Sequence, residues 1–220
     1  MNNLTRIVLL RHGQTAWNAN KRIQGQLDIP LDDTGLWQAE RLAQALEGEG
    51  IEVLYCSDLQ RARQTAAPLA ARTGLVAYTD SGLRERGFGR FEGQTYDDIE
   101  TQWPDDAQRW RRRELDFAPG GGESLTVFYE RAVNALQMLA ARHIGQTLAV
   151  VAHGGVLDCI YRAAVRVDLQ APRSWQLANA TINRLLWTPE GFSLVGWNDT
   201  GHLDGMGALE EIDARPAPHI

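Results

Sequence analysis

The chain has 220 residues, of which 44% are hydrophobic and 23% are charged. A chain of this length can bury a full hydrophobic core in one domain, which excludes a miniprotein held together by disulfides. The formal net charge of −6 opposes general binding to nucleic acids or to anionic membranes, while still allowing local basic pockets.

No segment has the pattern of a signal peptide or a membrane helix. The early apolar run ends at Leu10, far short of the roughly 20 apolar residues that a membrane helix needs. The two cysteines, Cys56 and Cys159, lack the CxxC spacing of metal and redox sites, so we expect both to be reduced thiols in the core. Together these features predict a cytoplasmic protein.

Apolar residues recur with the periods of strands and of amphipathic helices. Buried strands are predicted at 4–10, 53–56 and 147–152, and helices at 34–47, 59–72, 123–143 and 154–167. Segments 182–187 and 192–197 flank a turn signal and predict a hairpin. This alternation favours an α/β fold, a three-layer sandwich in which helices cover both faces of a mostly parallel sheet.

The chain shows no internal repeat, low-complexity tract or linker, so we expect a single domain over residues 1–220. The regular alternation is lost from Ser81 to Gly122, where short helices are predicted at 96–103 and 105–114. We therefore expect a helical insertion over the active site at about 93–122. A C-terminal tail is expected at about 203–220.

Three polar clusters each follow or flank a predicted strand. They lie within residues 11–18, 57–65 and 153–155, and they include Arg11, Arg61, His12 and His153. Because strand ends converge on one crevice in an open α/β sheet, we expect these clusters to meet. Guanidinium groups match the oxygens of a dianionic phosphoryl group, and the amino end of the helix beginning at Gly154 adds backbone donors. The natural ligand of such a pocket is a phosphate group.

These clusters resemble the motifs of the histidine phosphatase superfamily, the phosphoglycerate mutase-like proteins. RHGQTAWN at 11–18 is similar to the family signature, and SDLQRARQT at 57–65 to its second-arginine segment. LRE at 83–85 with FGRFEG at 88–93 is similar to its acid segment, AHGG at 152–155 to its second-histidine segment, and NDTGHL at 198–203 to a frequent closing motif. One Arg-His-Gly tripeptide is weak evidence, whereas four ordered segments at compatible spacing are specific.

The resemblance implies a role for each of five residues. His12 would be the nucleophile that forms a phosphohistidine, and Arg11, Arg61 and His153 would bind the phosphoryl oxygens. Glu85 would protonate the departing alkoxide and would then take a proton from the attacking water. The cationic neighbourhood disfavours imidazolium, which keeps His12 neutral and able to attack.

Further substrate contacts are expected from Asn18, Gln24, Gly25 and Gly154. Simple turn chemistry explains Gln24 and Gly25 equally well. Glu92 is an alternative acid, although we expect it to support the loop.

The basic run RWRRR at 109–113 has two interpretations. Such a run is usually a solvated helix face. In the mutase branch of the family, however, paired arginines in the equivalent insertion contact a phosphoglycerate, which makes Arg112 and Arg113 candidate binding residues. PGGGES at 119–124 resembles the phosphatase branch instead. Trp103 and Trp110 are candidates for the wall of a substrate pocket.

We therefore predict a histidine acid-type phosphatase that hydrolyses a small phosphorylated metabolite, with no metal or other cofactor. One alternative is a phosphoglycerate mutase dependent on 2,3-bisphosphoglycerate, and another is a non-catalytic phospholigand-binding protein. A third is a metal site at His12, His153 and Glu85, which the crowding arginines oppose. We expect no nucleic acid or membrane partner, and we keep a homodimer as an option.

Overall fold

The computed structural model describes residues 3–204, which build one six-stranded sheet in the order β3-β2-β4-β1-β5-β6. The strands are β1 (Thr5–Arg11), β2 (Val53–Cys56), β3 (Ala77–Thr79), β4 (Thr147–Ala152), β5 (Ile182–Thr188) and β6 (Gly191–Asp199). β1, β2, β3 and β4 are mutually parallel, β5 is antiparallel to β1, and β6 is antiparallel to β5. The prediction of a mostly parallel sheet is confirmed.

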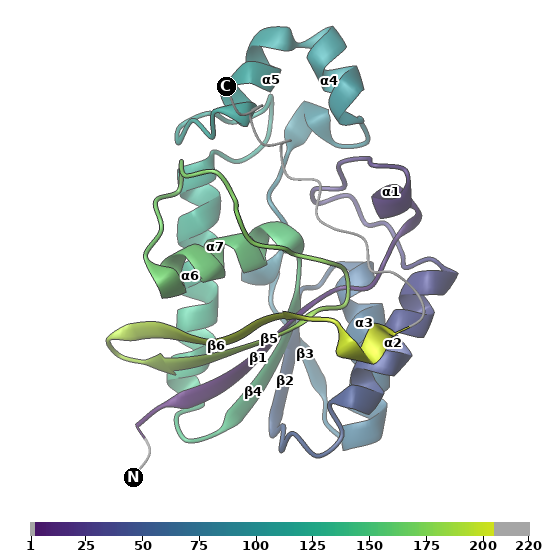
Figure 1. Cartoon of the computed structure of the whole chain (residues 1–220), viewed down its shortest axis with the longest axis vertical. Helices are drawn as coiled ribbons and strands as arrows, with labels where there is room; N and C mark the ends of the chain where they lie inside the picture. The colour runs from purple at the N-terminus through teal and green to yellow at the C-terminus, as the bar shows by residue number, and fades with distance from the viewer. Residues whose placement is uncertain (1–2, 205–220) are drawn as a thin grey trace.

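Helices cover both faces of this sheet, as Figure 1 shows. The α-helices of residues 3–204 are α1 (Ala16–Ala19), α2 (Asp33–Ala45), α3 (Gln60–Thr73), α4 (Tyr96–Gln102), α5 (Pro104–Arg111), α6 (Leu125–Arg142) and α7 (Gly154–Val165). α2 and α3 share one core with the sheet, and α6 and α7 share the other. The three-layer arrangement follows from these two cores.

β1 shows why the central strands contain continuous apolar runs in the sequence. Ile7 and Leu9 pack in the core of α6 and α7, whereas Val8 and Leu10 pack in the core of α2 and α3. Successive side chains of a strand point to opposite faces, so a strand covered on both sides needs apolar residues at every position. β1 and β4 therefore lie at the centre of the sheet, and their carboxyl ends face the site.

Two short elements differ from the sequence-based expectation. β3 has three residues at the edge of the sheet, and the side chain of Tyr78 is 54% exposed, so no buried apolar run predicts it. α1 has four residues and is held by reciprocal hydrogen bonds between Thr15 and Asn18. It is too short to show helical periodicity.

The insertion at 93–122 carries α4 and α5 and lies at the end of the molecule away from the sheet, at the top of Figure 1. It packs on a small aromatic core of its own, made by Phe88, Phe91, Tyr96, Ile99, Ala107, Trp110 and Phe117. Most of the predicted tail falls at 205–220, outside the residues that the structure describes. Within residues 3–204, no helix has the length and apolarity to cross a membrane.

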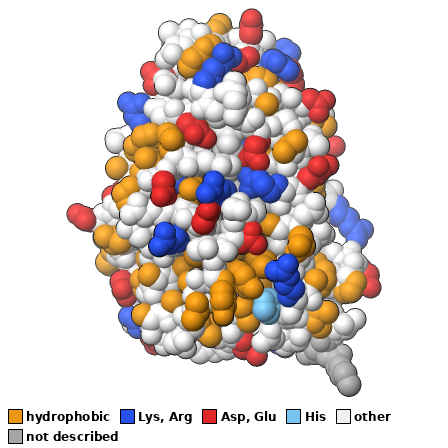
Figure 2. Space-filling view, turned by 180° about the vertical axis from the view of Figure 1, so that it is seen from behind, with side chains coloured by type: hydrophobic (Ala, Val, Ile, Leu, Met, Phe, Trp, Pro, Cys, Tyr) orange, Lys and Arg blue, Asp and Glu red, His pale blue; other side chains and the backbone are white. Residues whose placement is uncertain are grey.

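Figure 2 views the molecule from behind Figure 1 and shows basic and acidic side chains interspersed over that face. The two cysteines are buried and are not joined to each other, as expected. Burial raises the pKa of the Cys56 thiol to about 11. That thiol is therefore protonated and inert at neutral pH.

Candidate active site

His12 follows directly on β1, at the carboxyl edge of the sheet. Its backbone N–H donates to the carbonyl oxygen of Ala152 at 3.0 Å, which joins the ends of β1 and β4. Its ring Nδ1 lies 2.7 Å from the carbonyl oxygen of Gly13. A carbonyl oxygen only accepts, so Nδ1 carries the proton and the lone pair of Nε2 is available for attack.

Two glycines bring the start of α2 against the segment that carries His12. A Cβ atom at Gly13 would lie 2.6 Å from the carbonyl oxygen of Gly35, and one at Gly35 would lie 2.0 Å from that of Gln14. Neither position can therefore hold a side chain without moving the backbone. The backbone N–H of Gly13 also donates to Oγ1 of Thr65 on α3, at 3.0 Å.

His153 follows directly on β4, as the N-cap residue of α7, and its ring lies beside that of His12, with ring centroids 5.1 Å apart. It is fully buried, and neither ring nitrogen has a hydrogen-bond partner among residues 3–204. Burial lowers the pKa of both histidines well below the usual value, and the guanidinium groups of Arg61 and Arg11 lower it further. Both imidazoles are therefore neutral near pH 7.

Arg11 and Arg61 are each only 1% exposed. The Nη1 and Nη2 groups of Arg61 donate to the carbonyl oxygens of Leu27 and Gly25, both at 2.8 Å. Nη1 of Arg11 donates to the carbonyl oxygen of Leu177. Backbone carbonyls carry no net charge, so these contacts orient the guanidinium groups without neutralising them.

Glu85 reaches the site from the loop after the 3₁₀ turn η1 (Ser81–Leu83) and is 7% exposed. Its carboxylate accepts hydrogen bonds from the backbone N–H groups of Arg86, at 2.8 Å, and Gly155, at 2.9 Å. In the first turn of α7, the N–H of Gly155 thus donates to Glu85, while a contact of Gly154 with a ligand stays a prediction. A Cβ atom at Gly155 would lie 2.2 Å from Oε1 of Glu85, so this contact requires glycine.

Glu92, the alternative acid, supports the loop as the sequence suggested. Its Oε1 accepts hydrogen bonds from the backbone N–H groups of Gln26 and Phe88, both at 3.0 Å.

These residues surround a cavity of about 600 Å³, part of it open to solvent, which we call the histidine pocket. Its lining is formed by Arg11, His12, Asn18, Lys21, Arg22, Ile23, Gln24, Gly25, Arg61, Glu85, Phe88, Tyr96 and Trp110. His153 is not part of this lining, although its ring lies beside that of His12. Of the other expected contact residues, Gly154, Arg112 and Arg113 are not part of this lining.

The loop that follows His12 combines turn chemistry with pocket lining. Oδ1 of Asn18 accepts hydrogen bonds from the backbone N–H and the hydroxyl of Thr15, both at 3.0 Å. Gln24 is 8% exposed, and within residues 3–204 its Oε1 has no hydrogen-bond partner. Gly25 has φ +54°, a left-handed conformation that favours glycine.

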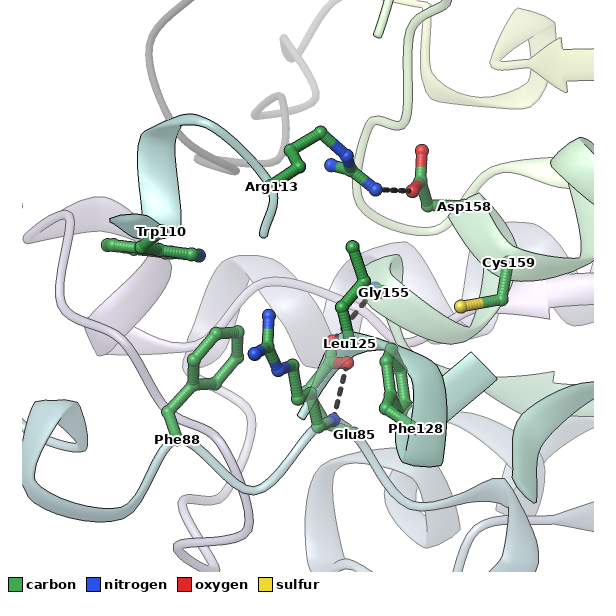
Figure 3. A pocket seen from close by; sticks show the side chains of 10 residues that line it. Glu85, Phe88, Trp110, Arg113, Leu125, Phe128, Gly155, Asp158 and Cys159 are labelled. Carbon is green, nitrogen blue, oxygen red and sulfur yellow. Dashed lines mark hydrogen bonds and ion pairs between the residues drawn. The ribbon is translucent and has the colours of Figure 1, made fainter. Parts of the chain in front are cut away.

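A second cavity of about 480 Å³, the side pocket, adjoins the first and shares Glu85, Phe88 and Trp110 with it (Figure 3). Its other lining residues are Arg86, Arg113, Leu125, Phe128, Gly155, Asp158 and Cys159. Nη2 of Arg113 donates to Oδ2 of Asp158 at 3.0 Å, and Nε of Arg162 donates to the same oxygen at 2.9 Å.

The basic run therefore divides between surface and pocket. Arg109 pairs with Glu114, Arg111 pairs with Glu100, and Arg112 is exposed. Only Arg113, with φ +52°, lines a cavity. Of the two candidate tryptophans, Trp110 lines both pockets, whereas Trp103 packs against the aromatic core of the insertion.

Sequence reasoning missed the segment before β5, which fixes the backbone of His12. Nδ2 of Asn179 and the backbone N–H of Ala180 both donate to the carbonyl oxygen of His12, at 3.1 Å. No local motif marks these residues, because their role depends on β5 pairing with β1. The metal alternative also lacks a site: within the described part of the chain, no three His, Cys, Asp or Glu side chains are grouped to hold an ion.

The comparison with known families decides which family the chain belongs to. Residues 7–200 match the model of the histidine phosphatase superfamily, branch 1. The chain belongs to this superfamily.

Individual histidine phosphatase relatives carry both phosphatase and mutase names. The chain is 38% identical over 208 residues to phosphoglycerate mutase-like protein 4 of Arabidopsis thaliana, covering 93% of this chain and 89% of the relative. It is 36% identical over 219 residues to a metal-independent phosphoserine phosphatase of the same plant, covering 97% and 90%. The structure of a mycobacterial glucosyl-3-phosphoglycerate phosphatase with VO3 is similar, with TM-score 0.78 and 33% identity over 89% of this chain and 99% of that one.

Proposed function

We propose that this histidine phosphatase hydrolyses a small phosphomonoester through a phosphohistidine formed on His12. The observation that carries the proposal is the 2.7 Å contact between Nδ1 of His12 and the carbonyl oxygen of Gly13, which leaves Nε2 as the nucleophile inside a pocket with two buried arginines. Relatives named as phosphatases support hydrolysis as the reaction.

In the first step, Nε2 of His12 forms a bond to phosphorus while the bond from phosphorus to the ester oxygen breaks. Glu85 gives its proton to that departing oxygen, and the alcohol leaves. In the second step, a water molecule gives a proton to Glu85 and attacks phosphorus, and the phosphorus–nitrogen bond breaks. The products are inorganic phosphate and a regenerated site.

Arg11, Arg61 and His153 would hold the phosphoryl oxygens during both steps. Phosphoryl transfer needs positioning and compensation of spread negative charge more than it needs covalent machinery. Asn18 and Gln24 are further candidates for contacts to the same oxygens, since both line the histidine pocket.

We propose that the alcohol portion of the substrate occupies the side pocket and carries an anionic substituent. Glu85 lines both pockets, so an ester oxygen beside it can direct the alcohol into the side pocket. Arg86 and Arg113 line that pocket, and Arg113 shares the carboxylate of Asp158 with the buried Arg162, so two guanidinium groups face one carboxylate at this wall. The excess of positive charge favours a carboxylate on the substrate.

Hydrolysis is favoured over the mutase alternative by the position of Arg112. A mutase must hold a phosphoglycerate in a closed site that excludes water, and the paired arginines would form that clamp. Arg112 is exposed and lines neither pocket, so the pair is split. The non-catalytic alternative would leave the neutral His12 and the oriented Glu85 without a use.

The test compares the wild-type protein with His12→Ala. The wild-type protein should release phosphate from p-nitrophenyl phosphate, retain activity after exhaustive chelation, and carry a phosphoryl label that is labile in acid and stable in base. His12→Ala should stay folded, take up no label and lose at least about 1,000-fold in kcat. Substantial turnover by His12→Ala would overturn the assignment of the nucleophile.

We further propose that the chain acts as one domain without a resident cofactor, in the cytoplasm, on a small-molecule substrate. Assembly as a homodimer stays a prediction, which sedimentation equilibrium can measure.

A further inference from the structure

A bidentate ion pair between Arg131 and Glu123 contacts the loop that carries Glu85, and neither residue lines the histidine pocket or the side pocket. Arg131 projects from α6, and Glu123 comes immediately before the N-cap residue of that helix. Nε of Arg131 donates to Oε1 of Glu123 at 2.8 Å, and Nη2 donates to Oε2 at 2.6 Å. The side chains are 24% and 19% exposed. Two parallel hydrogen bonds fix the relative orientation of the two groups more tightly than a single contact does.

The same guanidinium holds the backbone of the loop that carries Glu85. Nη1 of Arg131 donates to the carbonyl oxygens of Gly82 and Arg84, both at 2.9 Å, and Nη2 donates to that of Glu85 at 3.1 Å. A Cβ atom at Gly82 would lie 2.8 Å from the Cβ of Ala135 on α6, so the loop approaches the helix closely. One side chain thus fixes three carbonyl groups at and before Glu85.

Glu123 holds the backbone on the other side of Glu85. Its Oε2 accepts a hydrogen bond from the backbone N–H of Gly87 at 2.7 Å, and its own backbone N–H donates to the carbonyl oxygen of Gly87 at 2.7 Å. Burial acts to raise the pKa of Glu123, but hydrogen bonds from Arg131 and Gly87 outweigh it and lower the pKa. Glu123 is therefore ionised at neutral pH, as the ion pair requires.

We propose that Arg131 and Glu123 are positioning residues that fix residues 82–87 so that the carboxyl group of Glu85 stays aligned with the departing oxygen. This inference rests on the proposed function, in which Glu85 supplies the proton. Neither residue lines the histidine pocket or the side pocket, so neither touches the substrate there. Both residues act on Glu85 through the backbone of this loop. Glu123, the glutamate of the PGGGES segment, thereby has a physical role.

The role predicts a specific kinetic pattern. An alkyl ester such as glycerol phosphate has a poor leaving group and depends on the proton from Glu85, whereas p-nitrophenyl phosphate depends on it little. A loop that has lost its fixation should therefore slow the alkyl ester selectively. A general structural defect would slow both esters equally.

The experiment measures kcat and KM for both esters in Arg131→Gln, Arg131→Lys and Glu123→Gln, with Glu85→Gln as the reference pattern. We expect Arg131→Gln to lower kcat for glycerol phosphate about 30-fold and for p-nitrophenyl phosphate less than about threefold, with KM nearly unchanged. Arg131→Lys keeps the positive charge but not the forked guanidinium group. It should therefore also slow the hydrolysis of glycerol phosphate selectively, but by a smaller factor. Arg142→Gln, an exposed arginine on the same helix, is the control and should change neither ester.

The outcomes distinguish a failure of the proposed function from a failure of the positioning role alone. If the wild-type protein hydrolyses neither ester, the proposed function itself fails. If Glu85→Gln is selective but Arg131→Lys and Glu123→Gln are folded and lose activity equally on both esters, or lose none, only the positioning role is overturned. Those two milder variants also carry the test if Arg131→Gln does not fold.

Discussion

Arg11, His12, Arg61 and His153, which together we call the phosphoryl site, are each 3% exposed or less, whereas the arginines of the insertion mostly reach solvent. The phosphoryl site is held by backbone groups at the ends of central strands and by the first turn of α3. The insertion packs instead on its own aromatic core.

This difference separates the chemistry of transfer from the choice of substrate. The phosphoryl site lies in closely packed surroundings at the end of the sheet, beside the glycine contacts of Gly13 and Gly35, so few larger side chains fit there. The insertion can alter the residues that it presents to the side pocket while its aromatic core and the sheet stay intact. Variants in each region should therefore fail in different ways.

The largest effect is expected from removing a cation of the phosphoryl site. Arg61→Ala should lower kcat/KM for p-nitrophenyl phosphate by about 1,000-fold, because a buried guanidinium aimed at developing charge acts strongly in a dry site. Arg112→Ala, the matched change in the insertion, should stay within about twofold of wild type. Comparable losses in the two variants would erase the distinction between the regions.

A smaller effect is expected from displacing Glu85 without altering it. Gly155→Ala places a Cβ atom against Oε1 of Glu85, so the carboxyl group must move. The expected loss in kcat is about 100-fold for glycerol phosphate and much less for p-nitrophenyl phosphate. Gly196→Ala, where a Cβ atom would meet nothing within 4 Å, is the control. Equal slowing of both esters would argue against Glu85 as the acid.

A substitution in the insertion should change the selectivity between substrates with and without a carboxylate. Arg113→Gly removes the guanidinium from the side pocket and also relieves a left-handed backbone conformation at φ +52°. We expect kcat/KM to fall about tenfold for an ester that bears a carboxylate, such as phosphoserine, and to stay unchanged for p-nitrophenyl phosphate. A uniform change across both substrates would contradict the placement of the alcohol in the side pocket.

The smallest effect concerns stability against acid. Folding lowers the pKa of His12 and His153 below the unfolded value of about 6.5, so the unfolded chain binds more protons below that pH. The contribution of these two histidines to the free energy of unfolding should therefore be constant above about pH 7 and fall as the pH drops below 6.5, by up to about 1.4 kcal/mol per pH unit for each histidine. The midpoints of urea unfolding at several pH values measure this pH dependence. The free energy of unfolding should change less steeply with pH in His153→Gln than in the wild-type protein.

Much of the fold and of the phosphoryl site could be predicted because their signals are local. β1 and β4 contain the continuous apolar runs 7–10 and 148–152, and the motif residues come directly after these runs, so one rule about strand ends brings Arg11, His12 and His153 together. Glu85 was found through resemblance to the acid segment, since its loop has no periodicity of its own.

The residues that escaped prediction act across long sequence separations. Asn179 contacts the backbone of His12 only because β5 lies beside β1, and Arg131 reaches the loop of Glu85 only because α6 packs over it. Arg113 points into a cavity while Arg112 does not, a difference set by the backbone turn at the end of α5 and not by residue type. Such choices follow from tertiary packing, which composition and spacing do not encode.

The central position of β1 also sets the order in which the molecule can be completed. Val8 pairs with Ala149 on one side and with Arg184 on the other, so β1 is fully paired only after two strands that follow much later in the chain have been made. The carbonyl oxygen of His12 likewise accepts its hydrogen bond from Nδ2 of Asn179 only after that residue has been made. A nascent or truncated chain that stops before β5 therefore contains His12 without the contacts that fix its backbone, and we expect it to show no phosphatase activity until β5 has paired with β1.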